Sequence, residues 1–313
     1  MAFYSFDGNT LDSVGNYSMS TNPLLFFSNY VTGLIGSAVI FGSSHTYLSS
    51  SVRIPLDSRS FTIDFWFYAT TLTNTDEYGF AGECSFTTTD QCLFFSIRNS
   101  ILYMAFYNDD TNGITTLTTN QWYHATFVYD STAKMQLIYL NGVLEKSGTV
   151  SNDFLDTSAL FTIGRSSTNI LVQTFVYYLG YIDHFQISYR VKTPCEIYMN
   201  AILFCYFSFD LPSFLTDSGP NYLSAANSNG ISTIGRRNQG IQFSSATLSY
   251  VTISGVNVLN SSTNSFTISM WIKPSNLTGG GTLLHTSTQS DGGGSCFALW
   301  GFTSNGLFTV TIK

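Results

Sequence analysis

The chain has 313 residues and a formal net charge of −7, with only 10% charged residues against 16% aromatic ones. A surface with so few charges must be built from Ser, Thr, Asn and Gly, which is typical of extracellular β-proteins. The charge argues against a nucleic-acid partner, because no Lys/Arg cluster larger than Arg236-Arg237 is present to neutralise phosphates. No apolar stretch approaches the roughly 20 residues of a membrane-spanning helix, so no membrane span is expected.

The sequence repeats itself at a displacement of 205 residues, from position 60 to position 265. The heptapeptide Ser60–Trp66 recurs as Ser265–Trp271, and Tyr4–Asp7 recurs as Phe207–Asp210. A period of this length is too long for a solenoid and indicates tandem domains.

The repeat sets the expected domain boundaries. A first module is expected over 1–194, a short rigid linker over 195–204 and a second module over 205–313. The second copy stops opposite about position 108, so it is expected to be incomplete, with unpaired strand edges. The 313 residues are therefore interpreted as a fragment of a longer protein. The alternative is that a neighbouring chain completes the second module by strand addition.

Apolar residues alternate with a period of two through most of the chain, which predicts strands. The strand that begins at Phe61 has aromatic residues on both faces, as expected in the middle of a sandwich. Asn-Gly pairs at 112, 141 and 305 mark turns. Helical periodicity over three turns is absent, so the predicted fold class is all-β with a sheet-on-sheet core. The other strands in the first module are expected over 93–97, 101–107, 122–129, 135–140, 160–163 and 180–188.

Four motifs in order carry a family resemblance. A strand with Trp122-Tyr123-His124 is followed by a hairpin tip, Tyr139–Gly142, and then by Phe161–Arg165 and Gly180–Asp183. In these motifs the chain resembles the laminin-G-like branch of the concanavalin A-like lectin/glucanase superfamily. The resemblance covers the first module and the available part of the second. It implies a jelly-roll β-sandwich of two curved antiparallel sheets.

Catalysis is not expected. Relatives that cleave glycans place two Glu and an Asp at alternate positions of one strand, because retaining hydrolysis needs two carboxyl groups about 5 Å apart. The Glu residues of this chain are far apart in sequence, at 77, 83, 145 and 196. His124 and His184 are expected to be packed, hydrogen-bonded histidines. The chain is therefore predicted not to be an enzyme.

Acidic loops at the start of each module suggest a Ca²⁺ site. The loop 7–16 supplies hard oxygen ligands around a glycine, which suits Ca²⁺. The alternative is an ordinary turn in which Asp and Asn side chains bond their own backbone, and the sequence leaves both open. The candidate ligands are Asp7, Asp12 and Asn16, then Asp183, which the resemblance adds, and in the second copy Asp210, Asp217 and Asn221.

The cysteines and glycosylation signals agree with an extracellular location. Cys84 and Cys92 flank a Thr-rich loop, and a disulfide between them is predicted. Cys195 and Cys205 bracket the linker, which has no Pro, Gly or Ser and is expected to be rigid. A second disulfide between these two would fix the angle between the modules. Three N-glycosylation acceptors are Asn16, Asn260 and Asn276.

These features predict a non-enzymatic extracellular protein that acts in adhesion or in binding a glycan or another extracellular protein. Exposed aromatic rings would stack on sugars, and the candidates are Trp66, Tyr68, Tyr103, Tyr107 and Trp300. One alternative is a structural subunit of an extracellular filament or matrix that self-associates through serial modules. A second alternative is the non-catalytic module region of a larger glycan-active enzyme. Aromatic residues clustered in a groove would favour a lectin, and aromatic residues buried between modules would favour a filament.

Overall fold

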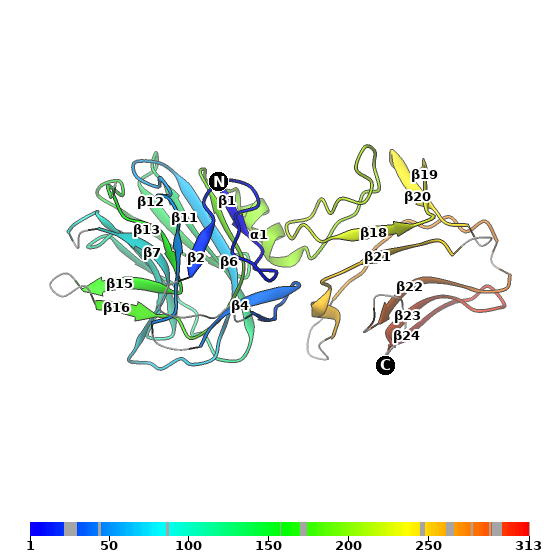
Figure 1. Ribbon diagram of the computed structural model, residues 1–313, viewed down its shortest axis with the longest axis horizontal. Coiled ribbons are helices and arrows are strands. Elements are labelled where there is room, and N and C mark those ends of the chain that lie inside the picture. The colour runs from blue at the N-terminus through cyan, green and yellow to red at the C-terminus, as the bar shows by residue number, and fades with distance from the viewer. Residues whose placement is uncertain are drawn as a thin grey trace. The chain divides into compact units, whose positions relative to one another are not determined.

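The computed structural model shows an almost entirely β chain. Its contacts divide it into two units, Met1–Phe204 and Cys205–Lys313, and each unit is described by itself (Figure 1). Within the described residues, no helix is long and apolar enough to cross a membrane. The structure describes residues 1–21, 30–42, 45–85, 88–156, 158–169, 174–244, 248–260, 266–276, 278–287, 289 and 296–312.

The first unit contains two antiparallel sheets. The strands of sheet A are β1 (Ala2–Tyr4), β3 (Tyr30–Thr32), β4 (Ser37–Phe41), β6 (Phe61–Ala69), β11 (Trp122–Asp130), β12 (Met135–Leu140), β13 (Val143–Thr149) and β17 (Gly180–Ser188). They lie in the order β13-β12-β11-β6-β17-β4-β3, with β1 paired to β17. Strand β6 is therefore central, between β11 and β17.

Sheet B faces sheet A across the core. Its strands are β2 (Met19–Thr21), β5 (Leu48–Ser50), β7 (Glu77–Cys84), β8 (Cys92–Arg98), β9 (Ile101–Ala105), β10 (Asp110–Asn112) and β14 (Thr162–Ile163). Their order is β10-β9-β8-β7-β14-β5-β2. A separate hairpin consists of β15 (Arg165–Asn169) and β16 (Thr174–Tyr177). The predicted all-β sandwich is confirmed.

Alternation along β6 explains why the two sheets pack. Its core-facing residues are fully buried, and the Phe65 ring lies 5.0 Å from the Phe80 ring of sheet B. Phe127 of β11 and Phe95 of β8 form a second contact across the core, at 4.9 Å. Each buried Phe contributes roughly 1.5–3 kcal/mol. The opposite residues of β6 face outward from the sandwich, and they form part of the site described below.

The predicted linker contains a helix, α1 (Pro194–Ile202), that the sequence pattern did not indicate. Thr193 and Glu196 form a capping box, and Pro194 occupies the first turn. Ile197 is buried against Val128 and Tyr139 on the outward side of sheet A. A nine-residue helix is too short to show an apolar stripe over three turns. Apart from Ile197 and Ala201, which are buried, α1 exposes the apolar residues Tyr198, Met199 and Ile202.

The second unit contains small separate sheets. Its elements are β18 (Ala225–Ser228), β19 (Ile231–Ile234), β20 (Gln239–Gln242), β21 (Tyr250–Ile253), a 3-10 turn (Asn257–Asn260), β22 (Gly281–Ser287), β23 (Cys296–Phe302) and β24 (Phe308–Ile312). Strand β18 pairs with β21, β19 pairs with β20, and β22-β23-β24 form a meander.

The repeated heptapeptide is a strand in the first unit only. Residues 266–271 form no strand, and Trp271 is 79% exposed. In the first unit β6 is held by β11 and β17 on its two sides. In the second unit, no described strand pairs with residues 266–271. The same local sequence there lacks the non-local pairing that makes it a strand in the first unit.

Candidate functional site

A row of aromatic side chains lies on the outward side of sheet A. The register pairs Trp122 of β11 with Tyr68 of β6, and Tyr68 with Tyr181 of β17. The Tyr68 and Tyr181 rings are stacked with centroids 5.1 Å apart, and the Trp122 ring is tilted against Tyr68 at 5.6 Å. All three side chains are half-buried. Adjacent strands thus bring together three rings that are distant in sequence, and we call them the aromatic row.

Trp66 and His124 form the next pair on the same face, two residues further along β6 and β11. Their rings meet at 5.0 Å in an edge-to-face contact, with Trp66 half-buried and His124 buried. Burial lowers the pKa of His124 to about 4; the nearby Lys192 also lowers it, while Asp64 raises it. The imidazole is therefore neutral at physiological pH, and Trp66 packs against an uncharged partner.

A buried ion pair and α1 close the next part of the same face. The Lys192 Nζ atom lies 2.6 Å from Asp64 Oδ2 and 2.5 Å from Gln186 Oε1. Asn200 of α1 donates to Asp64 Oδ1 at 3.2 Å. Ile197 of α1 packs against Val128 and Tyr139, so α1 covers one part of the outward face.

The outward side of sheet B is closed by its own contacts. Arg98 forms a two-pronged ion pair with Glu77 and lies over the Tyr103 ring, 3.8 Å from its centroid. Tyr103 also donates to Asp110 and is only 3% exposed. Tyr107 packs against this cluster. Of the predicted ligand residues, Tyr103 is therefore held inside a structural network, and Tyr107 borders it.

The structure separates the other predicted aromatic residues into two groups. Trp66 and Tyr68 lie on the outward side of sheet A as expected, whereas Trp300 lies in β23 of the second unit and is half-buried there. Trp122 and Tyr181 were missed. Both lie inside the motifs that carry the family resemblance, but only the pairing of β6 with β11 and β17 brings them beside Tyr68.

Asp12 organises its own loop. Its Oδ1 accepts hydrogen bonds from the backbone N–H groups of Phe3, Val14 and Gly15, and its Oδ2 accepts one from Tyr17, all at 3.0 Å. Burial acts to raise the pKa of Asp12, but these four donors outweigh it and hold the pKa below its usual value. Such contacts are those of a turn.

Asp7 and Asp183 hold a different turn. Asp7 Oδ1 accepts the Ser37 N–H at 2.7 Å, and Asp183 Oδ2 accepts the Ile35 N–H at 3.1 Å. Asp183 Oδ1 also lies 2.7 Å from His184 Nδ1. Neither carboxylate shares a partner with Asp12 among these contacts.

The second unit repeats these arrangements. Asp217 accepts the N–H groups of Tyr206 and Gly219 at 2.8 Å and that of Leu223 at 2.9 Å. Asp210 accepts the Gln239 N–H at 3.0 Å, as Asp7 does from Ser37. Of the two amides in the predicted set, Asn16 is exposed and Asn221 is buried. The turn interpretation thus accounts for the acidic residues of both copies.

The predicted calcium ligands do not form a metal cage in the part of the chain that is described. No group of three or more His, Cys, Asp or Glu side chains there is placed so that it could hold a metal ion. The expected convergence of Asp7, Asp12 and Asp183 on one ion is therefore not seen.

A different pair of carboxyl groups lies where three loops of the first unit meet, and we call it the rim pair, Asp90 and Asp109. Asp90 is 3% exposed, and its Oδ1 has no hydrogen-bond partner among the described residues, while Oδ2 accepts Asn152 Nδ2 at 2.8 Å. Burial raises the pKa of Asp90, and the Asp109 carboxyl adds to the rise. Gln136 donates to the Asp109 carbonyl at 3.2 Å, and its buried Oε1 likewise lacks a described partner. Unpaired buried oxygens of this kind fit a proton or a hard cation.

The structure joins Cys84 to Cys92 in a disulfide, the pairing that the sequence favoured. The second bridge that the sequence left open, between Cys195 and Cys205, is not formed, since both cysteines are free. The glycosylation candidates Asn16 and Asn276 are exposed, and the side chain of Asn260 lies outside the described residues.

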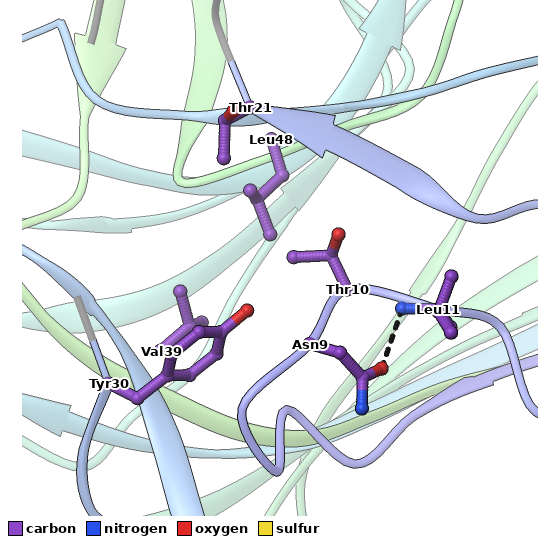
Figure 2. A pocket seen from close by; sticks show the side chains of 7 residues that line it. All are labelled: Asn9, Thr10, Leu11, Thr21, Tyr30, Val39 and Leu48. Carbon is purple, nitrogen blue, oxygen red and sulfur yellow. Dashed lines mark hydrogen bonds between the residues drawn. The ribbon is translucent and has the colours of Figure 1, made fainter. Parts of the chain in front are cut away.

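A cavity of about 360 Å³ opens between the edges of the two sheets (Figure 2). Tyr30, Val39 and Leu48 form its apolar wall, and the loop with Asn9 and Thr10 borders it. This cavity includes no member of the aromatic row. It is therefore a separate feature of the first unit.

Comparison with known families assigns the fold. A laminin G-type family model, described as the concanavalin A-like lectin/glucanases superfamily, matches residues 41–198, just over half of the chain. The chain belongs to this superfamily. The matched range contains all three residues of the aromatic row, so the candidate ligand-binding face lies within the superfamily domain. No curated protein matches the chain.

Solved structures resemble the superfamily domain at low identity. The binding domain of Paraclostridial Mosquitocidal Protein 1 is 16% identical with a TM-score of 0.51, over 81% of this chain and 63% of that one. Domain 4 of AbnA, a GH43 extracellular arabinanase from Geobacillus stearothermophilus solved with arabinotriose, is 23% identical with a TM-score of 0.47, over 63% of this chain and 95% of that one. A putative carbohydrate binding protein from Bacteroides ovatus is 19% identical with a TM-score of 0.41, over 51% of this chain and 45% of that one. These similarities concern the fold alone.

Proposed function

We propose that the first unit is a non-catalytic, extracellular glycan-binding module whose ligand lies on the aromatic row. The supporting observation is the row itself, which places Trp122, Tyr68 and Tyr181 at outward positions of adjacent strands. An antiparallel sheet with one solvated face normally carries polar residues there. Binding sites combine such apolar and aromatic surface with a few polar groups that orient the ligand. Sugars match this surface because their ring faces present C–H groups and their edges present hydroxyls.

The expected affinity is weak. If a sugar covers about 50 Å² on each of the three rings, the apolar contribution at about 25 cal/mol per Å² is roughly 4 kcal/mol. Because association also costs translational and rotational freedom, this contact alone supports a Kd of about 1 mM at best. Hydrogen bonds at the border of the row would strengthen binding, and linked modules would add avidity. A binding role in adhesion is consistent with this range.

The acidic residues support a non-catalytic role. Glu77 is paired with Arg98, Glu145 accepts the N–H groups of the 114–115 turn, and Glu196 caps α1. Glu83 is buried. Hydrolysis of a glycan needs two carboxyl groups that flank the bound sugar. In the described part of the chain, each Glu is thus engaged or buried away from the aromatic row.

The proposed location is extracellular. The Cys84–Cys92 disulfide supports it, because disulfides persist in oxidising compartments. The low content of charged residues agrees with it. The proposed partner is therefore a glycan on a cell surface or in a matrix.

A calcium ion at the rim pair is part of this proposal. Asp90, Asp109 and the amide oxygen of Gln136 would hold it, since these are the hard oxygen ligands that Ca²⁺ prefers. The ion would supply positive charge to the unpaired Asp90 oxygen and would connect loops of both sheets. The competing interpretation is a proton shared by the two carboxyl groups.

A glycan array with the complete chain tests the proposed function. The intact protein is expected to bind at least one glycan class, and Tyr181→Ala is expected to weaken that signal at least tenfold. Tyr107→Ala is the matched control, because Tyr107 is also half-buried but borders the closed face of sheet B. Equal losses in both variants, or no binding by the intact protein, would contradict the proposal. A change of oligomeric state in Tyr181→Ala would instead mark the row as a protein interface.

A further inference from the structure

The three strands that carry the aromatic row, and β4 beside them, contain no Lys or Arg among their described residues. Asp64, Asp130 and Asp183 are present in these strands. The segments 70–76, 117–121 and 177–179 border the row at the strand ends, and they contain no Lys or Arg either. They are tied to this end of the sheet by backbone hydrogen bonds, from Asn120 to Ala69 and from Thr70 to Leu179.

Two cations near Asp64 on this face of sheet A, Lys192 and Arg190, are already engaged. The Lys192 ammonium group contacts Asp64 and Gln186, and its side chain is only 5% exposed. Arg190 pairs with Glu196 of α1 at 2.7 Å. Arg165 lies on β15, which packs against sheet B, and its guanidinium group is held 3.4 Å from the Tyr47 ring centroid and 4.1 Å from that of Phe175. Each of these three cations is therefore held by a partner other than a ligand on the aromatic row.

The titratable groups on this face supply no free positive charge. Asp64 is neutralised by Lys192, and His124 is uncharged because burial lowers its pKa to about 4. Asp183 is fully buried and bonded to His184 and Ile35. The whole chain carries a net charge of −7. A sulfate or carboxylate on a sugar would lose its hydration at the row and gain no ion pair.

Uncharged polar groups border the row instead. Thr70, just after β6, and Asn120, just before β11, are both exposed. They are close in sequence to Tyr68 and Trp122, which are paired with each other. Hydroxyl and amide groups can both donate to and accept from sugar hydroxyls. The border of the site is therefore chemically matched to a neutral ligand.

We propose that the aromatic row selects neutral glycans and excludes sulfated and carboxylated ones. This inference rests on the proposed glycan-binding function and names the class of ligand for the same site. Because no ion pair contributes, the affinity depends little on ionic strength. An acidic glycan held by basic residues would instead bind with a steep salt dependence.

Titrations of the complete chain with defined oligosaccharides test the proposal. The neutral probes are hexasaccharides of arabinose, xylose, cellulose and maltose, and the acidic probes are a heparin hexasaccharide, hexagalacturonate and sialyllactose. Binding is measured by calorimetry at 20, 150 and 500 mM NaCl. We expect at least one neutral probe to bind with a Kd that changes less than twofold across the salt series, and no acidic probe to bind as tightly.

Two outcomes would overturn the proposal in distinguishable ways. Tighter binding of an acidic probe, with affinity falling at least tenfold between 20 and 500 mM NaCl, would refute neutral selectivity and leave glycan binding intact. Binding of no probe at any salt concentration would refute glycan binding itself. A variant with an added positive charge sharpens the test. Thr70→Lys is expected to bind an acidic probe at 20 mM NaCl and to lose this binding at 500 mM NaCl. The uncharged control Thr70→Gln is expected to bind no acidic probe. Failure of Thr70→Lys to bind any acidic probe would show that charge is not what excludes them.

Discussion

Replacing Lys192 with Met is expected to destabilise the first unit strongly. The change keeps the apolar stem of the side chain and removes only the ammonium group, which lies 2.6 Å from Asp64 and 2.5 Å from Gln186. Asp64 would remain buried with the Asn200 amide at 3.2 Å and the neutral His124 ring at 3.8 Å. Removing one member of a buried ion pair costs about 3–5 kcal/mol, because the remaining charge is left uncompensated.

Scanning calorimetry measures this effect on the intact chain. For a unit of this size, 1 kcal/mol shifts the Tm by about 2–4 °C, so Lys192→Met is expected to lower the Tm of the first unit by roughly 10 °C. The double variant Asp64→Asn with Lys192→Met removes both charges and is expected to recover most of that loss. A loss below about 1 kcal/mol in the single variant, or a double variant as unstable as the single one, would refute the reasoning.

Two further predictions concern titration and calcium. Because the folded pKa of His124 is about 4 and the unfolded value is 6.5, the unfolded chain binds the extra proton between these values. Stability should therefore fall as pH drops from 6.5 to 4, by about 1.4 kcal/mol per pH unit, and His124→Phe should flatten the stability curve over this window. At the rim pair, millimolar Ca²⁺ should raise the Tm of EDTA-treated protein. At a free Ca²⁺ concentration about one hundred times the Kd, the free energy of unfolding should increase by about 2.7 kcal/mol. This rise in Tm should vanish in Asp109→Asn and persist in Asp12→Asn. If the two carboxyl groups share a proton instead, Ca²⁺ should not change the Tm, and Asp109→Asn should be more stable than the intact protein.

The sequence predicted the parts of the fold that depend on local pattern. Alternation along the strand that begins at Phe61 predicted aromatic residues on both of its faces, and the structure places Phe65 and Phe67 in the core with Trp66 and Tyr68 on the opposite face. The motifs from Trp122 to Asp183 led to the correct superfamily. Period and motif suffice here because one strand face is fully buried, which fixes the direction of every side chain on it.

The rest of the site depends on non-local pairing. Trp122 and Tyr181 reach Tyr68 only through the register of three strands that are more than fifty residues apart. The opening Asp residues looked like metal ligands because their hydrogen-bond partners cannot be read from composition, and those partners are backbone N–H groups. The sequence did not reveal the rim pair, because Asp90 and Asp109 lie in separate loops that meet only in the folded chain.

The most direct test of the central claim compares two Trp→Ala variants in a titration with the neutral oligosaccharide that the intact chain binds. Trp122 lies in the aromatic row, whereas Trp271 is the highly exposed Trp of the second unit. Loss of one stacked ring is expected to remove about 1–2 kcal/mol, so the Kd of Trp122→Ala should rise about tenfold. Trp271→Ala should bind like the intact chain. Unchanged affinity in Trp122→Ala, with its fold and Tm preserved, would show that the outward face of sheet A is not the glycan site.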